Sequence, residues 1–481
     1  MCTAVSNCIS IPQFKHSKVI SEETMKKNQM LFKVLSILCL LSLLAACAPA
    51  ATQAPAATEA PAATQGSAAT EAPAATEAPA EPVTLSYLVD DSQNTQDTAK
   101  ALADAYTALH PNVTITIETR PGGTDGDNLV KTRLATGDMN DIFWYNTGSL
   151  FQALHPAETL VDLTNEPFIA NIVDSFTPTV SQDGKIYGVP TGTAMGGGIL
   201  YNKKIYAQLG LSVPKTWAEF EANNEKIKAA GIAPVAATYG DTWTSQLFVL
   251  ADYHNVQQVD SSFAADYTAN KAKYASIPAA MAGFTYLREG FDKGWYQKDF
   301  ATTKFDQGLK LLADGTVAHY PMLTFALSTI AANYPDKVND IGFFGVPGTD
   351  ASKNGTTIWM PAGTYIPKTT KNLTVAKDFL AFIASPAGVD AINAKIAPQG
   401  PFLIKGTKLP DDVLPAVKDL AAYIDAGNTT PALEFLSPIK GPNLEQICVA
   451  VGSGQMDAAT AAANYDEDVK KQAQQLGLPG W

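Results

Sequence analysis

The chain has 481 residues, a formal net charge of −13 and a hydrophobic fraction of 46%. The apolar content is typical of a globular protein. The acidic balance argues against a nucleic-acid-binding protein, which needs basic patches, and against attraction to an anionic membrane surface. The stretch from residue 83 onward is longer than one compact core accommodates, so it predicts two domains.

Cysteine and histidine give no support to a disulfide, a metal site or a cofactor. Of the five cysteines, only Cys448 follows residue 82, so the folded part cannot form an internal disulfide. The five histidines are scattered, without the spacing of metal ligands. The motifs of serine hydrolases, zinc metalloproteases and P-loop proteins are absent from the sequence. We therefore expect neither a metal nor a cofactor.

A short apolar segment ends in a cysteine near the start of the chain. Three lysines within residues 26–33 precede the apolar run 34–46, and Cys47 follows it. The run is shorter than the roughly 20 residues of a membrane-spanning helix, and it is typical of a secretory signal. Leu44-Ala45-Ala46-Cys47 resembles a bacterial lipobox, which implies a lipid on the Cys47 sulfur. An ordinary secretory signal is the alternative.

These features predict the organisation of the first 82 residues. We expect residues 1–46 to hold upstream residues and the lipoprotein signal peptide, with Met25 as the natural start. Residues 47–82 then form the lipidated cysteine and a linker of Ala, Pro, Thr and Glu. We expect the linker to stay disordered because its composition cannot bury a core.

Strand and helix patterns alternate after residue 83. Apolar residues in helical spacing predict a helix ending at Leu109, and a Gly/Asp turn at 122–127 precedes a second helix through Leu134. Strands are expected at 83–89, 113–117 and 141–144. This order predicts a parallel sheet with right-handed crossovers. Ligands bind beyond the carboxyl ends of such strands.

Helices dominate the chain after Pro190. The series Thr216-Trp217-Ala218-Glu219 predicts a capping box that starts a helix. Apolar patterns predict further helices at 278–291, 304–313, 376–384, 410–426 and 464–476, and strands at 341–346 and 365–366. Gly196–Gly198 interrupts an expected strand, and we expect a bulge there rather than close approach of a ligand to the backbone.

An ordered series of short segments resembles a known family. The segments are Tyr187–Pro190, Leu200–Lys203, Leu209–Leu211, Pro214–Phe220 and Lys228–Pro234. Together they resemble family 1 extracellular solute-binding proteins of bacterial ABC importers, the maltose-binding-protein-like group. Residues 313–318 also resemble a family segment, although His319 replaces its usual Met.

The resemblance implies an α/β, two-lobed periplasmic-binding-protein fold of type II, maltose-binding-like, with hinge strands between the lobes. Lobe 1 would contain residues 83–190 and 323–362. Lobe 2 would contain residues 192–320 and 365–481. Crossings between the lobes are expected near Val189–Thr191, Tyr320–Phe325 and Pro361–Tyr365.

The expected site lies between the lobes, where solute capture requires flat aromatic faces and polar groups but no catalytic residue. Core packing is the alternative for the aromatic candidates, and a helix cap or a solvated loop is the alternative for the polar ones. The expected ligand-binding residues are Asp91, Asn94, Trp144, Asp241, Trp243, Trp359 and Tyr365.

The signal and the lipobox-like segment predict an exported lipoprotein held on the outer face of the cytoplasmic membrane, at the cell surface or in the periplasm, and we expect a monomer. It would capture a mono- or oligosaccharide and deliver it to the membrane subunits of an ABC permease, without being an enzyme. A secreted glycoside hydrolase is one alternative, and it would need two carboxylates roughly 5–10 Å apart. A surface sugar receptor without a role in transport is the other.

Overall fold

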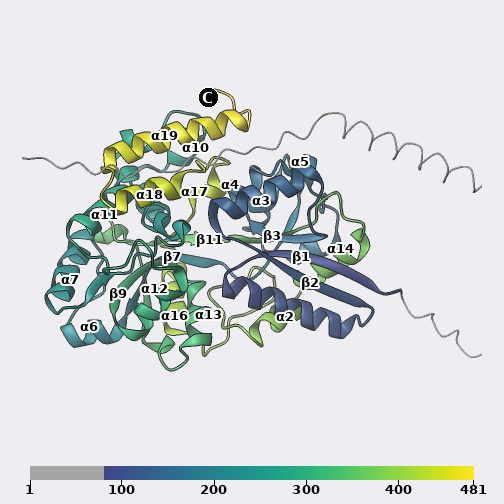
Figure 1. Cartoon of the computed structure of the whole chain (residues 1–481), viewed down its shortest axis with the longest axis horizontal. Helices are drawn as coiled ribbons and strands as arrows, with labels where there is room; N and C mark the ends of the chain where they lie inside the picture. The colour runs from purple at the N-terminus through teal and green to yellow at the C-terminus, as the bar shows by residue number, and fades with distance from the viewer. Residues whose placement is uncertain (1–80) are drawn as a thin grey trace, which may run out of the picture. The chain divides into compact units, whose positions relative to one another are not determined.

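The computed structural model describes residues 81–481, which form two lobes that each have their own mixed sheet (Figure 1). The expected signal sequence, Cys47 and almost all of the linker lie outside the described residues. Within residues 81–481, no helix combines the length and the apolar character needed to cross a membrane.

Lobe 1 is built on a five-stranded sheet. β1 runs parallel to β2 and to β3, whereas β12 is antiparallel to β3 and to β6. The expected parallel start of this sheet is therefore confirmed. The strands follow in the order β2 (Val113–Arg120), β1 (Val83–Asp90), β3 (Ile142–Asn146), β12 (Ala362–Tyr365) and β6 (Gly188–Pro190).

Helices cover both faces of this sheet and close the core of lobe 1. The Gly/Asp segment that was expected as a turn forms the first turn of α3, which begins at Gly123. The large buried side chains of this core include Tyr87, Phe143, Phe151 and Phe379. The helices are α2 (Gln93–Leu109), α3 (Gly123–Thr136), α4 (Gly148–Gln152), α5 (Pro156–Thr159), α14 (Leu373–Ile383) and α15 (Pro386–Asn393).

Lobe 2 is built around β7, whose eight residues are all buried. One side of β7 pairs with β9, and the other side pairs with β11 and then with β10. The strands are β7 (Met195–Asn202), β8 (Ala233–Val235), β9 (Val317–Leu323), β10 (Ile341–Gly345), β11 (Thr356–Trp359) and β13 (Thr429–Pro431).

Two apolar cores flank the sheet of lobe 2 and are enclosed mainly by helices. The capping box is confirmed, because Thr216 Oγ1 accepts from Glu219 N while the Glu219 carboxylate accepts from Thr216 N. Figure 1 shows α19, in yellow, beside α18 and α10. The helices are α6 (Lys203–Leu209), α7 (Trp217–Ala229), α8 (Leu247–Ala251), α9 (Tyr253–Val259), α10 (Phe263–Thr268), α11 (Pro278–Asp292), α12 (Phe305–Asp314), α13 (Ala326–Asn333), α16 (Pro415–Asp425), α17 (Leu433–Leu436), α18 (Leu444–Gly452) and α19 (Ala458–Gln475).

The chain crosses between the lobes at 190–195, at 359–362 and at 404–409. The crossing expected near Tyr320–Phe325 is wrong, because β9 and α13 both pack in lobe 2. The expected assignment of 323–362 to lobe 1 is wrong for the same reason, since β10 and β11 pair with β7. Residues 365–404, expected in lobe 2, pack largely on the core of lobe 1.

Gly196–Gly198 form regular strand rather than the expected bulge. All three glycines lie within β7 and are buried. A Cβ at Gly197 would overlap the indole ring of Trp359, and a Cβ at Gly196 or Gly198 would collide with the Phe343 ring. Because glycine has no side chain, the rings of Trp359 and Phe343 pack directly against the strand. This packing holds Trp359 at the boundary of the lobes.

His319 is an ionisable group in the core of lobe 2. It is fully buried on β9, and its ring lies near Phe220 and Phe344. Nδ1 donates to the Pro234 carbonyl at 2.9 Å, so Nε2 accepts from the Tyr206 hydroxyl at 2.7 Å. Burial lowers the pKa of His319 to about 3, because the charged ring would lose its hydration there.

This burial predicts a pH-dependent stability that one substitution removes. The unfolded chain binds a proton at His319 near pH 6.5 and the folded chain does not, so folding stability falls as the pH drops below that value. From pH 7 to pH 5 the loss is about 2 kcal/mol. In urea titrations, the free energy of unfolding of His319→Met should fall by about 2 kcal/mol less than that of the wild type between pH 7 and pH 5. His155→Gln, at an exposed position, is the control. An unchanged pH dependence in His319→Met would contradict this account of the core.

Candidate functional site

A cavity of about 220 Å³ lies between the two lobes. From lobe 1 it is lined by the residues that follow the carboxyl ends of β1, β2 and β3, as expected for a sheet of this type. From lobe 2 it is lined by the short 3-10 helix η3 (Thr242–Gln246), the end of β11 and the segment 434–445. The first crossing forms part of its wall.

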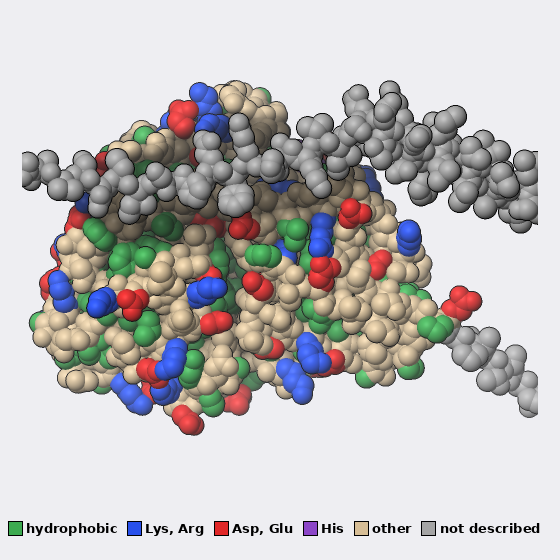
Figure 2. All heavy atoms as spheres, in the orientation of Figure 1, with side chains coloured by type: hydrophobic (Ala, Val, Ile, Leu, Met, Phe, Trp, Pro, Cys, Tyr) green, Lys and Arg blue, Asp and Glu red, His purple; other side chains and the backbone are tan. Residues whose placement is uncertain are grey.

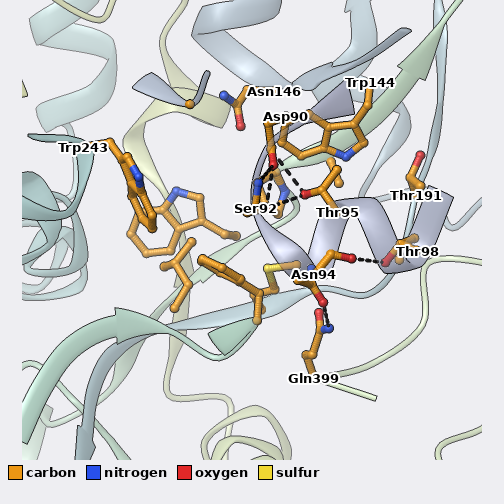
Figure 3. Close-up of a pocket in the computed structure, with 18 of the residues that line it drawn as sticks. Asp90, Ser92, Asn94, Thr95, Thr98, Trp144, Asn146, Thr191, Trp243 and Gln399 are labelled. Atoms are coloured by element: carbon orange, nitrogen blue, oxygen red, sulfur yellow. Dashed lines mark hydrogen bonds between the residues drawn. The ribbon is translucent and has the colours of Figure 1, made fainter. Parts of the chain in front are cut away.

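Three tryptophans contribute aromatic faces to this cavity. Trp144 comes from lobe 1, and Trp243 and Trp359 come from lobe 2. Figure 3 shows Trp144 and Trp243 on opposite sides of the cavity. The Trp243 ring is supported by Phe305 and Phe325, whose ring centroids lie 5.2 and 6.1 Å from its own. The aromatic surface is thus divided between the lobes.

A hydrogen-bonded polar cluster lies at the end of β1. Asp90 Oδ1 accepts from the backbone N–H and the hydroxyl of Ser92, and Asp90 Oδ2 accepts from Thr95 Oγ1 at 3.2 Å (Figure 3). Burial raises the pKa of Asp90, while the Ser92 hydrogen bond and the Arg120 charge oppose the shift. These contacts hold the start of α2 against the cavity.

Asp91 and Asn94, both predicted ligand-binding residues, line the cavity. Asp91 is exposed, and its Oδ1 accepts from Gly122 N at 3.2 Å. The Asn94 side-chain oxygen accepts from Ser328 Oγ at 2.6 Å and from Gln399 Nε2 at 2.7 Å. Because Ser328 belongs to α13 of lobe 2, the Asn94 oxygen connects the lobes directly. The second carboxylate oxygen of Asp91 has no hydrogen bond to any of the described residues, so it can accept one from a ligand.

Two other predicted residues are not at the cavity surface. Tyr365 lies in β12, an interior strand, where it is fully buried and stacks on Phe151 with centroids 5.5 Å apart. The Asp241 Oδ2 atom accepts from Phe305 N at 2.8 Å, and Asp241 immediately precedes η3. Tyr365 is therefore a core residue, and Asp241 positions the segment that carries Trp243.

Several buried polar atoms of the cavity wall have no hydrogen-bond partner within residues 81–481. Two of them, Thr193 Oγ1 and Gln246 Oε1, belong to side chains that are 6% and 7% exposed. Arg120 Nε and Asn393 Oδ1 are the others. A buried polar atom without a partner costs about 1–3 kcal/mol. A polar ligand that bonds these atoms would remove that cost.

One end of the cavity is rich in carboxylates. We call this the acidic end and define it by Asp127, Glu434 and Glu445 together with Gln246 and Lys440. Burial raises the pKa of Glu434 and of Glu445, and the Lys440 charge opposes both shifts. Asp127 adds a further negative charge that acts on both glutamates. Burial therefore outweighs the favourable contacts that the protein gives to these two carboxylates.

Glu445 also joins the lobes across this end. Its carboxylate accepts from Thr242 Oγ1 of its own lobe at 2.7 Å and from the Thr124 backbone of lobe 1. Its Oε2 atom lies only 3.1 Å from where a Cβ on Gly123 of lobe 1 would be. Gly123 is the first residue of α3 and has φ +67°. The carboxylate thus lies at the amino-terminal end of α3, where negative charge is favourable.

The acidic end was not found from the sequence. Glu434, Lys440 and Glu445 follow Asp127 of α3 by more than 300 residues along the chain, and no local pattern links them to it. Arg120 could have been predicted, because it ends β2 at the same edge of the sheet as Asp91 and Trp144. Within residues 81–481, no group of three or more His, Cys, Asp or Glu residues has the arrangement of a metal site.

Comparison with solved structures supports the fold. A chitin oligosaccharide binding protein has TM-score 0.69 and 22% sequence identity, over 82% of this chain and 99% of that one. The two-lobed arrangement is therefore that of solute-binding proteins of the maltose-binding-like type, as expected.

Comparison with characterised sequences gives the same family. A multiple sugar-binding protein from Streptococcus mutans is 25% identical over 316 residues, 63% of this chain and 72% of the relative. The melibiose/raffinose/stachyose-binding protein of Bacillus subtilis is 23% identical over 341 residues, 66% of this chain and 73% of the relative. Residues 92–390, more than half of the chain, match the family described as bacterial extracellular solute-binding protein. The chain belongs to this family of bacterial extracellular solute-binding proteins.

Proposed function

We propose that this protein captures a mono- or oligosaccharide between its lobes and delivers it, chemically unchanged, to the permease of an ABC importer. The observation that carries the proposal is the placement of three indole rings from both lobes around one cavity. Indole faces cover the apolar faces of sugar rings, and buried oxygens such as Gln246 Oε1 accept from sugar hydroxyls.

The charge of the cavity supports a sugar over an anionic solute. Its lining includes the carboxylates of Asp90 and Asp91 and those of the acidic end, against the basic groups of Arg120 and Lys440. A phosphate ester or a carboxylated solute would be repelled by this excess. The names of the two relatives reported above point the same way, because both are sugar-binding proteins.

Contacts of both lobes with one ligand would couple capture to a change of shape. A ligand that contacts Trp144 in lobe 1 and Trp243 in lobe 2 binds the closed arrangement more tightly than the open one. This difference in affinity stabilises the closed arrangement. The crossings provide the segments about which the lobes turn. The closed form would then be the one that the permease recognises.

The experiment that tests the proposal is a thermal-shift screen over mono- and oligosaccharides. A ligand that binds only the native state stabilises it by about 2.7 kcal/mol at a hundred times its Kd, which raises the melting temperature. A shift with at least one sugar is expected. Stabilisation by a phosphate ester or a peptide, with none by any sugar, would contradict the proposal.

The same screen separates capture from hydrolysis. A glycoside hydrolase would also bind a sugar, but it would release shorter products on prolonged incubation. Chromatography of the stabilising sugar after incubation should recover it intact. Appearance of a product would contradict capture without chemical change and would favour a glycoside hydrolase.

Trp243 should contribute strongly to affinity. Trp243→Ala removes one of the aromatic faces, so isothermal titration should show affinity for the stabilising sugar weakened by well over tenfold, with the fold intact by circular dichroism. Trp481→Ala is the matched control, because Trp481 bonds to the Thr268 carbonyl and does not line the cavity. Wild-type affinity in Trp243→Ala would remove Trp243 from the site.

Gly123 should be needed for closure. A Cβ at this position would lie 3.1 Å from Glu445 Oε2, where the lobes meet, so Gly123→Ala should reduce ligand affinity at least fivefold by titration calorimetry. Gly137→Ala is the control, because Gly137 ends the same helix at φ +78° but faces only the Thr369 methyl. The control should lose stability and keep its affinity. Equal affinities in both variants would show that the contact is not needed for closure.

We also propose that the exported protein is tethered by a lipid on Cys47. The lipobox-like series before it supports this proposal. Cys47→Ser in a bacterial host should move the protein from the membrane fraction to the soluble exported fraction, because the anchoring chains are lost. Fractionation followed by immunoblotting measures the change. A variant that stays in the membrane fraction would show that another segment anchors the chain.

A further inference from the structure

The acidic end of the cavity holds more carboxyl groups than basic groups. Asp127 comes from α3 of lobe 1, Glu434 from α17 and Glu445 from α18 of lobe 2. Lys440 is the basic side chain whose charge opposes the pKa shifts of both glutamates. Arg120, the other basic group of the cavity wall, acts on Asp90 and lies over the Trp144 and Tyr145 rings. The acidic end therefore holds three carboxyl groups against one ammonium, and burial outweighs what the protein offers to stabilise the ionised forms of Glu434 and Glu445.

One residue of the same region has a buried acceptor without a partner. Gln246 is 7% exposed, and its Oε1 atom has no hydrogen-bond partner within residues 81–481. Gln246 lines the main cavity and also a small adjoining pocket, and both spaces share Asp127, Lys440 and Glu445. An orphaned acceptor among carboxylates needs a donor, which a carboxylate or a phosphate of a ligand cannot provide.

The protein supplies some donors to the carboxylates of this end, because the Trp359 side chain donates to Glu434 and the Thr124 backbone donates to Glu445. Glu445 Oε2 is bonded to Thr242, and its carboxylate is close to the start of α3. Gln246 Oε1 and the excess of carboxyl groups over basic groups remain for the ligand. A sugar hydroxyl offers one proton and no charge, whereas an ammonium offers three protons and a positive charge.

We propose that the ligand is a cationic amino sugar whose protonated amine lies at the acidic end, among Glu434, Glu445 and Gln246. The inference rests on the proposed capture of a sugar and specifies its chemical class. The sugar rings lie against the indole faces. The ammonium donates to the carboxylates and to Gln246 Oε1, and charge-assisted hydrogen bonds of this kind are stronger than neutral ones.

Matched pairs of sugars test this assignment. Titration calorimetry on the full folded chain would compare β-1,4-linked glucosamine dimers and tetramers with their N-acetylated forms and with neutral glucose oligomers of the same length. The free-amine form should bind at least tenfold more tightly than either neutral form. Its advantage should shrink between 50 and 500 mM salt, because salt screens charge–charge attraction in a partly open site.

Two charge-removing variants localise the effect. Glu434→Gln and Glu445→Gln keep the side-chain shape but remove a charge, so each should reduce the preference for the free amine by about tenfold. Glu158→Gln, at an exposed position of lobe 1 outside the cavity, should leave the preference unchanged. Unchanged melting temperatures of the unliganded variants would show that they fold.

The outcomes separate this inference from the proposed function. Tighter binding of the free amine, lost in the two variants, supports the assignment. Equal or tighter binding of a neutral form overturns the amine and leaves sugar capture intact. Failure of every sugar to bind overturns both. A preference for the amine that persists in both variants would place the ammonium elsewhere in the cavity and contradict the assignment.

Discussion

The arrangement of this protein depends on the three passages of the chain between its lobes. Because the passages at 190–195, 359–362 and 404–409 tie one sheet to the other, each lobe is completed by segments far apart in sequence. The carboxyl ends of β1, β2 and β3 therefore face η3 and the segment 434–445 across one cavity. On the face shown in Figure 2, acidic and basic side chains are interspersed, whereas in the lining of the cavity the carboxyl groups outnumber the basic groups.

The same contacts that bring the lobes together also carry an energetic cost. Glu445 loses hydration where it approaches the start of α3, and burial accordingly raises its pKa. Thr242 and Lys440 offset part of this cost, and Asn94 contributes a neutral contact between the lobes through Ser328. A ligand that supplies donors to the remaining acceptors would favour the closed arrangement. The charge state of Glu445 and the closure of the lobes therefore depend on each other, because Glu445 lies where the lobes meet.

Local patterns predicted the fold well where one segment determines its own structure. The alternation of strands and helices before residue 146 and the capping box at Thr216 are both present, since periodicity and capping act within a few residues. The same reasoning placed Asp91 and Trp144 at the edge of the sheet. It failed for Tyr365, whose burial depends on β12 entering between β3 and β6, and for Glu445, which meets α3 only after the whole chain has folded.

Small-angle scattering with and without ligand tests most directly whether the two lobes grip a sugar between them. The sugar that gives the largest thermal shift should reduce the radius of gyration of the wild-type folded part, because closure brings the lobes together. The Gly123→Ala variant should contract less at the same fractional saturation, since its side chain obstructs the contact with Glu445. A wild-type protein that is saturated with a tightly bound sugar and keeps its unliganded dimensions would contradict the account.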